Sequence, residues 1–247
     1  MLIRKHWVFN KLINNNVMNR IAGIKAISFD ADGTLWDFEK VMRHSLGCVL
    51  KKLEEIDPSL TALLSIEKMV EVRNRVASEL KGKITNLEDV RLEAFRQTLI
   101  EIGKPDDALA FHLNRIYLEH RFEDIELFDD VLLVLRKLKG KYTLGILSNG
   151  NSCPERCGLD NMFQFVVFSQ DYGIEKPDPR LFQTALEKAG CRKSELLHIG
   201  DSLDTDVMGA INTGIKCVWI NRKKEKNEMN FRADYEISAL TELLVLV

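Results

Sequence analysis

Short apolar runs recur along the chain, and each predicts a buried β-strand. Each run holds four to six residues and is followed directly by a polar or glycine-bearing loop. An apolar run without polar alternation is typical of a strand that is covered on both faces. The five predicted strands are Ala26–Phe29, Tyr142–Leu147, Phe165–Phe168, Leu196–Ile199 and Cys217–Ile220.

Helical patterns separate these strands. Apolar residues recur at helical spacing over residues 131–138, and Gly140 follows them as a stop signal. Asp178 and Pro179 provide an N-cap and a first-turn proline for another helix, which Gly190 ends. Strands that alternate with helices predict an α/β fold, in which right-handed crossovers build a parallel sheet with helices on both faces.

One interval breaks the alternation. Between Trp36 and about Phe122 the sequence shows only amphipathic helical patterns, so it predicts an all-helical insertion. One apolar stripe comprises Val41, Met42, Val49, Leu53 and Ile56, and further helices cover roughly residues 60–80, 87–102 and 106–121. The insertion leaves after the first strand, at the sheet edge where ligands of α/β proteins bind, so it either covers a site or only adds stability.

Composition narrows the classes of function. The chain has 247 residues, of which 45% are hydrophobic, so it can bury a sizeable core. Lys and Arg together number 35 against 37 for Asp and Glu, and this balance argues against a nucleic-acid partner. There is no apolar run of 18 residues, so we expect no membrane-spanning helix and no membrane partner.

The cysteines and the N-terminus add two expectations. Five cysteines without a CxxC pair predict reduced thiols and a cytoplasmic location. Residues 1–20 form a basic, asparagine-rich extension that lacks the apolar segment of a signal peptide. Because Met18 precedes the first strand so closely, we expect residues 1–17 to be dispensable.

The strongest chemical signal follows the first strand. Asp30 and Asp32 are two residues apart, so at strand spacing their carboxylates point the same way. Gly33 permits a sharp exit of the chain. Aspartates also occur in ordinary turns, and a calcium loop is another reading, but Thr34 and Leu35 stand where that loop needs an acidic residue and a glycine.

Three other strand ends carry polar groups. Ser148, Asn149 and Gly150 follow the second strand and can donate hydrogen bonds to phosphate oxygens. Lys176 lies in the loop after the third strand. The fourth strand is followed by Asp201, Asp204 and Asp206, of which one could serve only as a helix cap.

Together these strand ends would gather carboxylates that repel one another. A hard divalent cation with oxygen ligands, such as Mg2+, removes that repulsion. Carboxylates, a hydroxyl, a lysine and Mg2+ suit phosphoryl transfer, in which positioning and charge stabilisation dominate.

In these motifs the chain resembles the haloacid dehalogenase-like superfamily, in particular the members with a helical cap. The motifs are Asp30-Ala-Asp32-Gly33-Thr34, Leu147-Ser148-Asn149-Gly150, Lys176-Pro177 and Gly200-Asp201 with Asp206. The resemblance implies a Rossmann-like α/β core over residues 21–37 and 123–247, and a cap domain over residues 38–122.

The resemblance also implies roles for the site residues. Asp30 is the expected nucleophile, which forms an aspartyl-phosphate, and Asp32 is the expected general acid and base. The expected ligands of Mg2+ are Asp30, the main-chain carbonyl of Asp32 and Asp201, supported by Asp206, while Asp204 receives no metal role. Ser148, Asn149 and Lys176 are expected to bind the phosphoryl group.

The resulting prediction is a phosphatase that hydrolyses a small-molecule phosphate monoester. Haloacid dehalogenases share the fold, but they lack an acid at the position of Asp32, because a leaving halide needs no proton. A sugar-phosphate mutase and a non-catalytic binding protein remain alternatives. The natural substrate and the choice between monomer and homodimer stay open, and the polar candidates on the cap are Arg43, His44, Arg73 and Arg75, each weighed against a solvated position.

Overall fold

The core of the protein is a six-stranded sheet in which all neighbouring strands are parallel. The computed structural model describes residues 20–247, so the expected dispensability of residues 1–17 lies outside the described residues. The strand order is β3-β2-β1-β4-β5-β6. The strands are β1 (Ala26–Phe29), β2 (Thr143–Ser148), β3 (Phe165–Phe168), β4 (Leu196–Gly200), β5 (Lys216–Ile220) and β6 (Tyr235–Ile237). The five predicted strands are therefore confirmed, and β6 is an additional one.

Strand β1 lies inside the sheet, between β2 and β4. Its last residue, Phe29, is in register with Ile146 of β2 and Ile199 of β4. All four β1 residues are buried, as expected for a strand that helices cover on both faces. The loops that follow β1, β2 and β4 therefore meet at one edge of the sheet.

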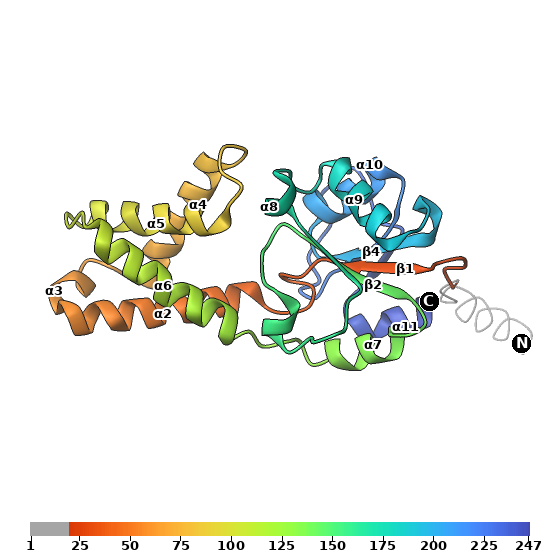
Figure 1. Cartoon of the computed structure of the whole chain (residues 1–247), viewed down its shortest axis with the longest axis horizontal. Helices are drawn as coiled ribbons and strands as arrows, with labels where there is room; N and C mark the ends of the chain where they lie inside the picture. Colours follow the sequence, from red (N-terminus) through yellow and green to blue (C-terminus); the bar gives the residue numbers. More distant parts are fainter. Residues whose placement is uncertain (1–19) are drawn as a thin grey trace, which may run out of the picture.

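Helices cover both faces of the sheet (Figure 1). One face packs against α7 (Val131–Leu138) and α11 (Leu243–Leu246), and the other packs against α9 (Pro179–Ala189) and α10 (Met208–Thr213). The Asp178 side chain caps α9 by accepting a hydrogen bond from the Arg180 backbone N–H, as the sequence predicts. The predicted fold class, an α/β parallel sheet with helices on both faces, is confirmed.

The interval after β1 folds as a separate group of helices that projects from the sheet (Figure 1). These helices are α2 (Phe38–Ile56), α3 (Pro58–Thr61), α4 (Ile66–Leu80), α5 (Leu87–Glu101) and α6 (Asp107–Glu123). They share a hydrophobic cluster of their own, which includes Leu53, Leu99 and Leu113. The predicted domain bounds stay a prediction, and we call the segment from α2 to α6 the helical insertion.

Two details of the helical insertion differ from the sequence prediction. The helix expected over residues 60–80 is interrupted, because the chain turns between α3 and α4 before Ser65 caps α4 through the Lys68 backbone N–H. Ile56, assigned to the apolar stripe of α2, is 48% exposed and is the last residue of that helix.

Two connections join the helical insertion to the sheet. The outgoing connection carries Trp36, which is fully buried and forms a β-bridge with Leu127 of the returning connection. Asp37 then caps α2 by accepting a hydrogen bond from the Lys40 backbone N–H.

Short helices in the core loops are Pro154–Cys157, α8 (Ser169–Tyr172), Lys193–Glu195, the π-helical turn Leu203–Val207 and Leu240–Glu242.

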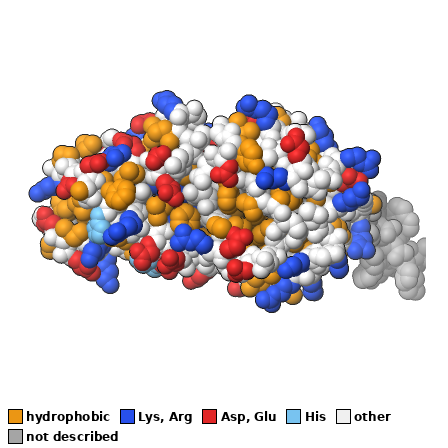
Figure 2. Space-filling model, in the orientation of Figure 1, with side chains coloured by type: hydrophobic (Ala, Val, Ile, Leu, Met, Phe, Trp, Pro, Cys, Tyr) orange, Lys and Arg blue, Asp and Glu red, His pale blue; other side chains and the backbone are white. Residues whose placement is uncertain are grey.

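The surface carries both signs of charge. Figure 2 shows acidic and basic side chains interspersed on the displayed face of the core and the helical insertion. For the described residues on this face, the pattern differs from the single-sign stripe that nucleic-acid binding requires. None of the helices within residues 20–247 is both long and apolar enough to cross a bilayer.

Candidate active site

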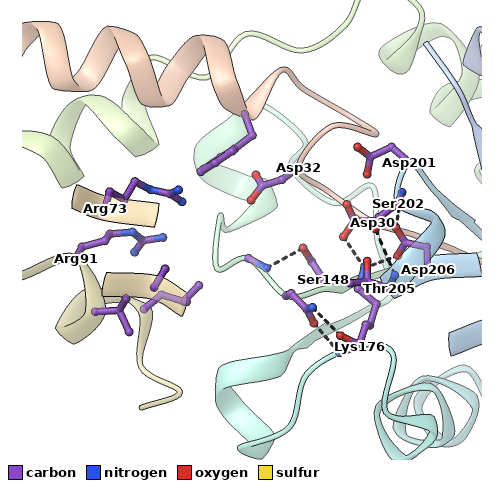
Figure 3. A pocket seen from close by; sticks show the side chains of 16 residues that line it. Asp30, Asp32, Arg73, Arg91, Ser148, Lys176, Asp201, Ser202, Thr205 and Asp206 are labelled. Carbon is purple, nitrogen blue, oxygen red and sulfur yellow. Dashed lines mark hydrogen bonds and ion pairs between the residues drawn. The ribbon is translucent and has the colours of Figure 1, made fainter. Parts of the chain in front are cut away.

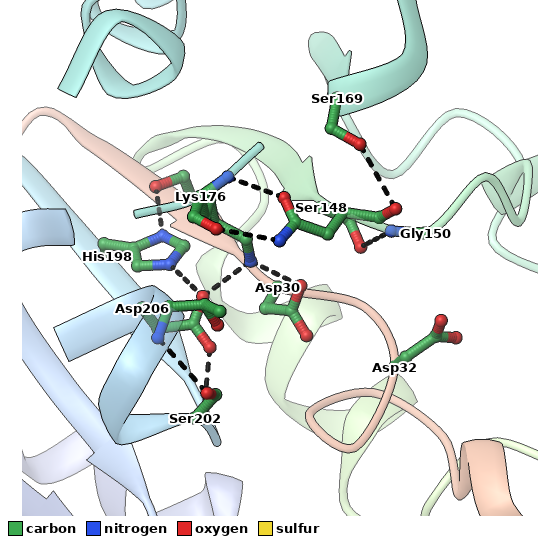
Figure 4. A network of polar contacts seen from close by, with 12 residues as sticks. Asp30, Asp32, Ser148, Gly150, Ser169, Lys176, His198, Ser202 and Asp206 are labelled. Carbon is green, nitrogen blue, oxygen red and sulfur yellow. Dashed lines mark hydrogen bonds and ion pairs between the residues drawn. The ribbon is translucent and has the colours of Figure 1, made fainter. Parts of the chain in front are cut away.

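Three charged side chains meet at the carboxyl edge of the sheet (Figure 4). Asp30 follows β1, Asp206 lies in the π-helical turn after β4, and Lys176 comes from the loop before α9. Lys176 Nζ donates to Asp30 Oδ1 and to Asp206 Oδ1, each at 2.6 Å. All three residues are buried, so the lysine charge is matched within the protein rather than by solvent.

Burial and charge act on these three groups in opposite directions. Burial, together with the negative charges of Asp206 and Asp201, raises the pKa of Asp30 to about 8, although the charge of Lys176 acts to lower it. Burial also acts to raise the pKa of Asp206, but Lys176 and His198 hold it at about 2. For Lys176, burial lowers the pKa, but the two carboxylates outweigh it and leave the pKa above its usual value.

The carboxylates also form a group that fits a divalent cation. Carboxylate oxygens of Asp30, Asp201 and Asp206 all lie within 4.8 Å of one another. Although Asp201 is exposed, desolvation and the charge of Asp206 raise its pKa to about 7. Burial is the first cause of both raised pKa values, so a bound cation would offset the cost of ionising these two carboxylates, and hard oxygen donors are the ligands that Mg2+ prefers.

The two glycines of these loops make room for the carboxylates. A Cβ atom on Gly33 would lie 2.2 Å from Asp201 Oδ2, and the φ of Gly33 is +84°, which L side chains rarely adopt. A Cβ atom on Gly200 would lie 2.1 Å from Asp206 Cγ. Any side chain at either position would therefore displace an acidic group of the site.

Asp32 lies on the opposite side of the pocket floor from Asp206 and has a different environment. Its Oδ1 accepts hydrogen bonds from Trp36 Nε1 at 2.6 Å and from Arg121 at 3.0 Å. Arg121 is fully buried in the last turn of α6 and packs its guanidinium over the Phe38 ring. The Asp32 side chain keeps 24% of its surface exposed toward the pocket. The helical insertion therefore supplies a buried cation that holds a carboxylate of the core.

The loop after β2 brings a hydroxyl and an amide to the site. Ser148 Oγ accepts a hydrogen bond from the Gly150 backbone N–H at 3.0 Å, and its own proton remains available to a ligand. The Asn149 side chain donates to the Lys176 carbonyl at 3.1 Å and accepts from the Lys176 N–H at 2.8 Å. The Asn149 side chain therefore holds the Lys176 backbone, and its expected contact with a phosphoryl group stays a prediction.

The structure adds groups to the site that the sequence analysis did not identify. His198 is a polar residue inside β4. Its Nε2 lies 2.9 Å from Asp206 Oδ1, and its Nδ1 lies 2.9 Å from Ser28 Oγ. Both His198 and Ser28 are fully buried. The only sequence signal for His198 is its place in an otherwise apolar strand.

The loop after β4 corrects one expectation about the aspartates. The N-cap of the π-helical turn is Ser202, whose hydroxyl accepts from the Thr205 N–H. Asp204 is exposed and takes no part in the cluster of Asp30, Asp201 and Asp206. The expectation that one of these aspartates caps the helix is therefore wrong, because Ser202 is the N-cap.

Core and helical insertion together enclose a cavity of about 330 Å³ above these groups (Figure 3). The core contributes the acidic cluster, Ser148 and Lys176, and α4 and α5 contribute Arg73 and Arg91, which Figure 3 shows pointing toward Asp32. Burial lowers the pKa of Arg91 to about 10, and its NH1 has no hydrogen-bond partner among residues 20–247.

The other polar candidates on the helical insertion lie away from the cavity. Arg43 pairs with Glu39 and Glu67, and Arg75 pairs with Glu101 and Glu79, all on the surface. His44 contacts Asp124 at 2.9 Å. Of the four candidates from the sequence, only Arg73 lines the cavity.

A model of the haloacid dehalogenase-like hydrolase family matches residues 24–214. The chain therefore belongs to the haloacid dehalogenase-like hydrolases and is an enzyme. The match spans the core strands β1 to β4 and the whole helical insertion. The resemblance in the sequence motifs is thereby confirmed.

Several particular proteins are similar over nearly the whole chain. The glyceraldehyde 3-phosphate phosphatase of Methanothermobacter thermautotrophicus is 30% identical over 90% of this chain and 100% of its own length. The 5-amino-6-(5-phospho-D-ribitylamino)uracil phosphatase of Escherichia coli is 27% identical over 91% of this chain and 96% of its own. A solved structure of a 2-haloacid dehalogenase from Pseudomonas syringae is 30% identical in sequence and superposes with a TM-score of 0.76. The match covers 90% of this chain and 97% of the dehalogenase chain.

Proposed function

We propose that the protein is a Mg2+-dependent phosphatase that hydrolyses a small-molecule phosphate monoester through an aspartyl-phosphate on Asp30. The observation that carries this proposal is the pair of carboxylates at the cavity floor, with Asp30 held by Lys176 and Asp32 held by Arg121. Two carboxylates in different environments can take two different roles, one as nucleophile and one as proton donor.

Asp30 is the proposed nucleophile. Lys176 holds its Oδ1, whereas its Oδ2 has no hydrogen-bond donor among the described residues and is the oxygen free to attack phosphorus. The attack forms an O–P bond to Asp30 and breaks the bond from phosphorus to the leaving oxygen, so one displacement becomes two easier steps. Lys176 and the Ser148 hydroxyl stabilise the charge of the transferring group.

Asp32 is the proposed general acid and base. Trp36 and Arg121 fix its Oδ1, which leaves Oδ2 toward the cavity, where a Cβ atom on Gly150 would lie only 2.6 Å away. In the first step Asp32 donates a proton to the leaving oxygen. In the second step it takes a proton from the water that cleaves the aspartyl-phosphate.

Mg2+ is the proposed cofactor. Asp30, Asp201 and the main-chain carbonyl of Asp32 would hold it, and Asp206 would support Asp30 and Asp201 through their shared cluster. When bound, the ion supplies positive charge against the phosphate oxygens. Its charge also favours the ionised form of Asp30, whose pKa is otherwise raised by burial.

The cavity suits the phosphate ester of a small polar molecule. Arg73 and Arg91 place two positive charges above the catalytic carboxylates, so they favour a leaving group that itself carries anionic or hydroxyl groups. The similar proteins from M. thermautotrophicus and E. coli are named as phosphatases, which supports this class of substrate. A sugar-phosphate mutase uses the same first step, and a cytoplasmic monomer or homodimer remains our working expectation.

The second candidate function is a haloacid dehalogenase, favoured by the similar structure from P. syringae. A dehalogenase displaces halide from carbon and needs neither a metal nor a proton donor. Asp32, held by two hydrogen bonds at the cavity floor, has no task in that reaction. We therefore rank this function second.

The test is phosphate release from p-nitrophenyl phosphate with Mg2+ or EDTA. The unmodified protein should turn over only with Mg2+, and Asp30→Asn should abolish turnover. The matched control is Asp204→Asn, which changes an exposed aspartate of a neighbouring loop outside the cluster and should leave turnover intact. Metal-independent release of chloride from 2-chloropropionate, without phosphate release, would reverse the ranking.

A further inference from the structure

A second cluster of metal-binding side chains lies on the helical insertion, apart from the catalytic carboxylates. His44 and Cys48 are one turn apart on α2, and His120 and Asp124 are one turn apart at the end of α6. Since α2 and α6 pack side by side, the two pairs face each other. We propose that His44, Cys48 and His120 bind a zinc ion, with Asp124 as their charged partner.

The distances between the donor atoms fit one ion. A ligand atom from each of His44, Cys48 and His120 lies within 4.8 Å of the other two. Cys48 Sγ and His44 Nε2 are 3.7 Å apart. Tetrahedral zinc with bonds of about 2.3 Å to sulfur and 2.0–2.1 Å to nitrogen separates two such atoms by roughly 3.6 Å. The side chains therefore need little movement to share the ion.

Asp124 completes the charge and the orientation of the cluster. Its Oδ2 lies 2.9 Å from His44 Nε2 and 2.8 Å from His120 Nδ1, so it already joins the two imidazoles. In the metal-free protein this carboxylate holds both imidazoles in place, and it stays beside the ion once their nitrogens bind zinc. The Cys48 thiolate and the Asp124 carboxylate together carry two negative charges, which balance Zn2+.

The donor chemistry separates this cluster from the catalytic one. Imidazole and thiolate donors select borderline-soft ions such as Zn2+, whereas Mg2+ takes oxygen ligands. His44, His120 and Asp124 are each partly exposed, so an ion can reach them from solvent. Binding releases the proton of the Cys48 thiol to the buffer, while each ligating imidazole binds through the ring nitrogen that carries no proton.

The position of the cluster gives the ion a structural task. Helix α2 begins one residue after Asp37, and Asp124 is the C-cap of α6, so both helices meet the core here. His120 also adjoins Arg121, the partner of Asp32. Zinc bound here fastens the two ends of the helical insertion to each other next to the turn that carries Arg121.

The first test is titration with Co2+, which replaces zinc and reports a thiolate ligand by a charge-transfer band in the near ultraviolet. The full chain is kept in excess Mg2+, which occupies sites made of oxygen ligands. We expect the band to saturate at one ion per chain. Cys48→Ser should abolish it, and Cys153→Ser, a change at another partly exposed cysteine, should retain it.

The second test is the effect of Zn2+ on thermal unfolding in the same excess of Mg2+. Zinc at about 100 times its Kd should raise Tm by roughly 5–10 °C for a chain of this size. His120→Ala should lose this rise, whereas His112→Ala on the same helix should keep it. Absence of the Co2+ band, its survival in a folded Cys48→Ser variant, or an unchanged rise in His120→Ala would each overturn the proposal.

Discussion

Arg121 and Asp32 form an ion pair of 3.0 Å across the boundary between the helical insertion and the core. The arginine is fully buried, and two of its guanidinium nitrogens, Nε and NH1, have no hydrogen-bond partner within residues 20–247. Its pairing with Asp32 is therefore the main compensation for burying its charge. This contact links the placement of α6 to the geometry of the proposed acid and base.

Arg121→Met should lower kcat by roughly 10-fold to 100-fold, because a misplaced proton donor loses its alignment with the leaving oxygen. The loss should be larger for an alkyl phosphate than for p-nitrophenyl phosphate, since the poorer leaving group depends more on protonation by Asp32. Steady-state kinetics on both substrates measure this difference. Arg121→Lys should recover part of the activity, and an equal loss on both substrates would contradict the positioning role.

Asp206→Asn should lower the free energy of unfolding by about 3–5 kcal/mol, because Lys176 would keep only one of its two buried carboxylates. Urea unfolding in EDTA measures this change without a contribution from bound metal. Adding Lys176→Met to the variant removes the undercompensated charge and should restore part of the stability. A double variant that is no more stable than Asp206→Asn would show that the pair does not act through charge.

The strands could be predicted because most of them are short, buried and apolar throughout. Strand β6 escaped prediction, because Tyr235–Ile237 has three residues at the sheet edge and includes the exposed Glu236. The break before α4 was missed for a different reason. Leu60 and Leu64 are buried on either side of the turn, so the hydrophobic pattern continues where the helix does not.

The site could be predicted as far as it depends on strand ends. Asp30, Lys176 and Asp206 each follow a strand, and parallel strands bring such positions to one edge. Arg121 is 89 residues from Asp32 in the chain, and its partner depends on where the helical insertion folds back. Helical periodicity alone does not show where the helices of the insertion lie relative to the core. The contacts of Arg121 and Arg91 with the site could therefore not be predicted from the sequence.

Glu195→Gln should reduce stability at neutral pH, and this effect should become smaller in acid. Hydrogen bonds from Arg192, and then from Lys25, hold the pKa of Glu195 below its usual value. A carboxylate with a lowered folded-state pKa stabilises the protein above its unfolded pKa of about 4.3, and the contribution fades as pH falls further. Urea unfolding from pH 7 to pH 3.5 measures the difference between the variant and the original chain.

The control for this pH dependence is Glu119→Gln, at an exposed glutamate of α6. It should leave the unfolding midpoint unchanged at every pH. If Glu195→Gln kept the same destabilisation at pH 3.5 as at pH 7, the stabilisation would not come from the charge of Glu195.

Arg91→Met should reveal which part of a substrate the helical insertion recognises. Arg91 lines the cavity, and its NH2 group donates to Asn151 at 2.9 Å. Its buried NH1 group has no hydrogen-bond partner within residues 20–247. For a phosphate ester with a second anionic group, KM should rise roughly 10-fold or more, the loss of about one charge-assisted hydrogen bond. For p-nitrophenyl phosphate, which lacks that group, KM should stay nearly constant. Arg75→Met, at a surface arginine paired with Glu101, is the matched control and should change neither value. Equal rises in KM for both substrates would mean that Arg91 acts on the phosphoryl group or on folding rather than on the leaving group.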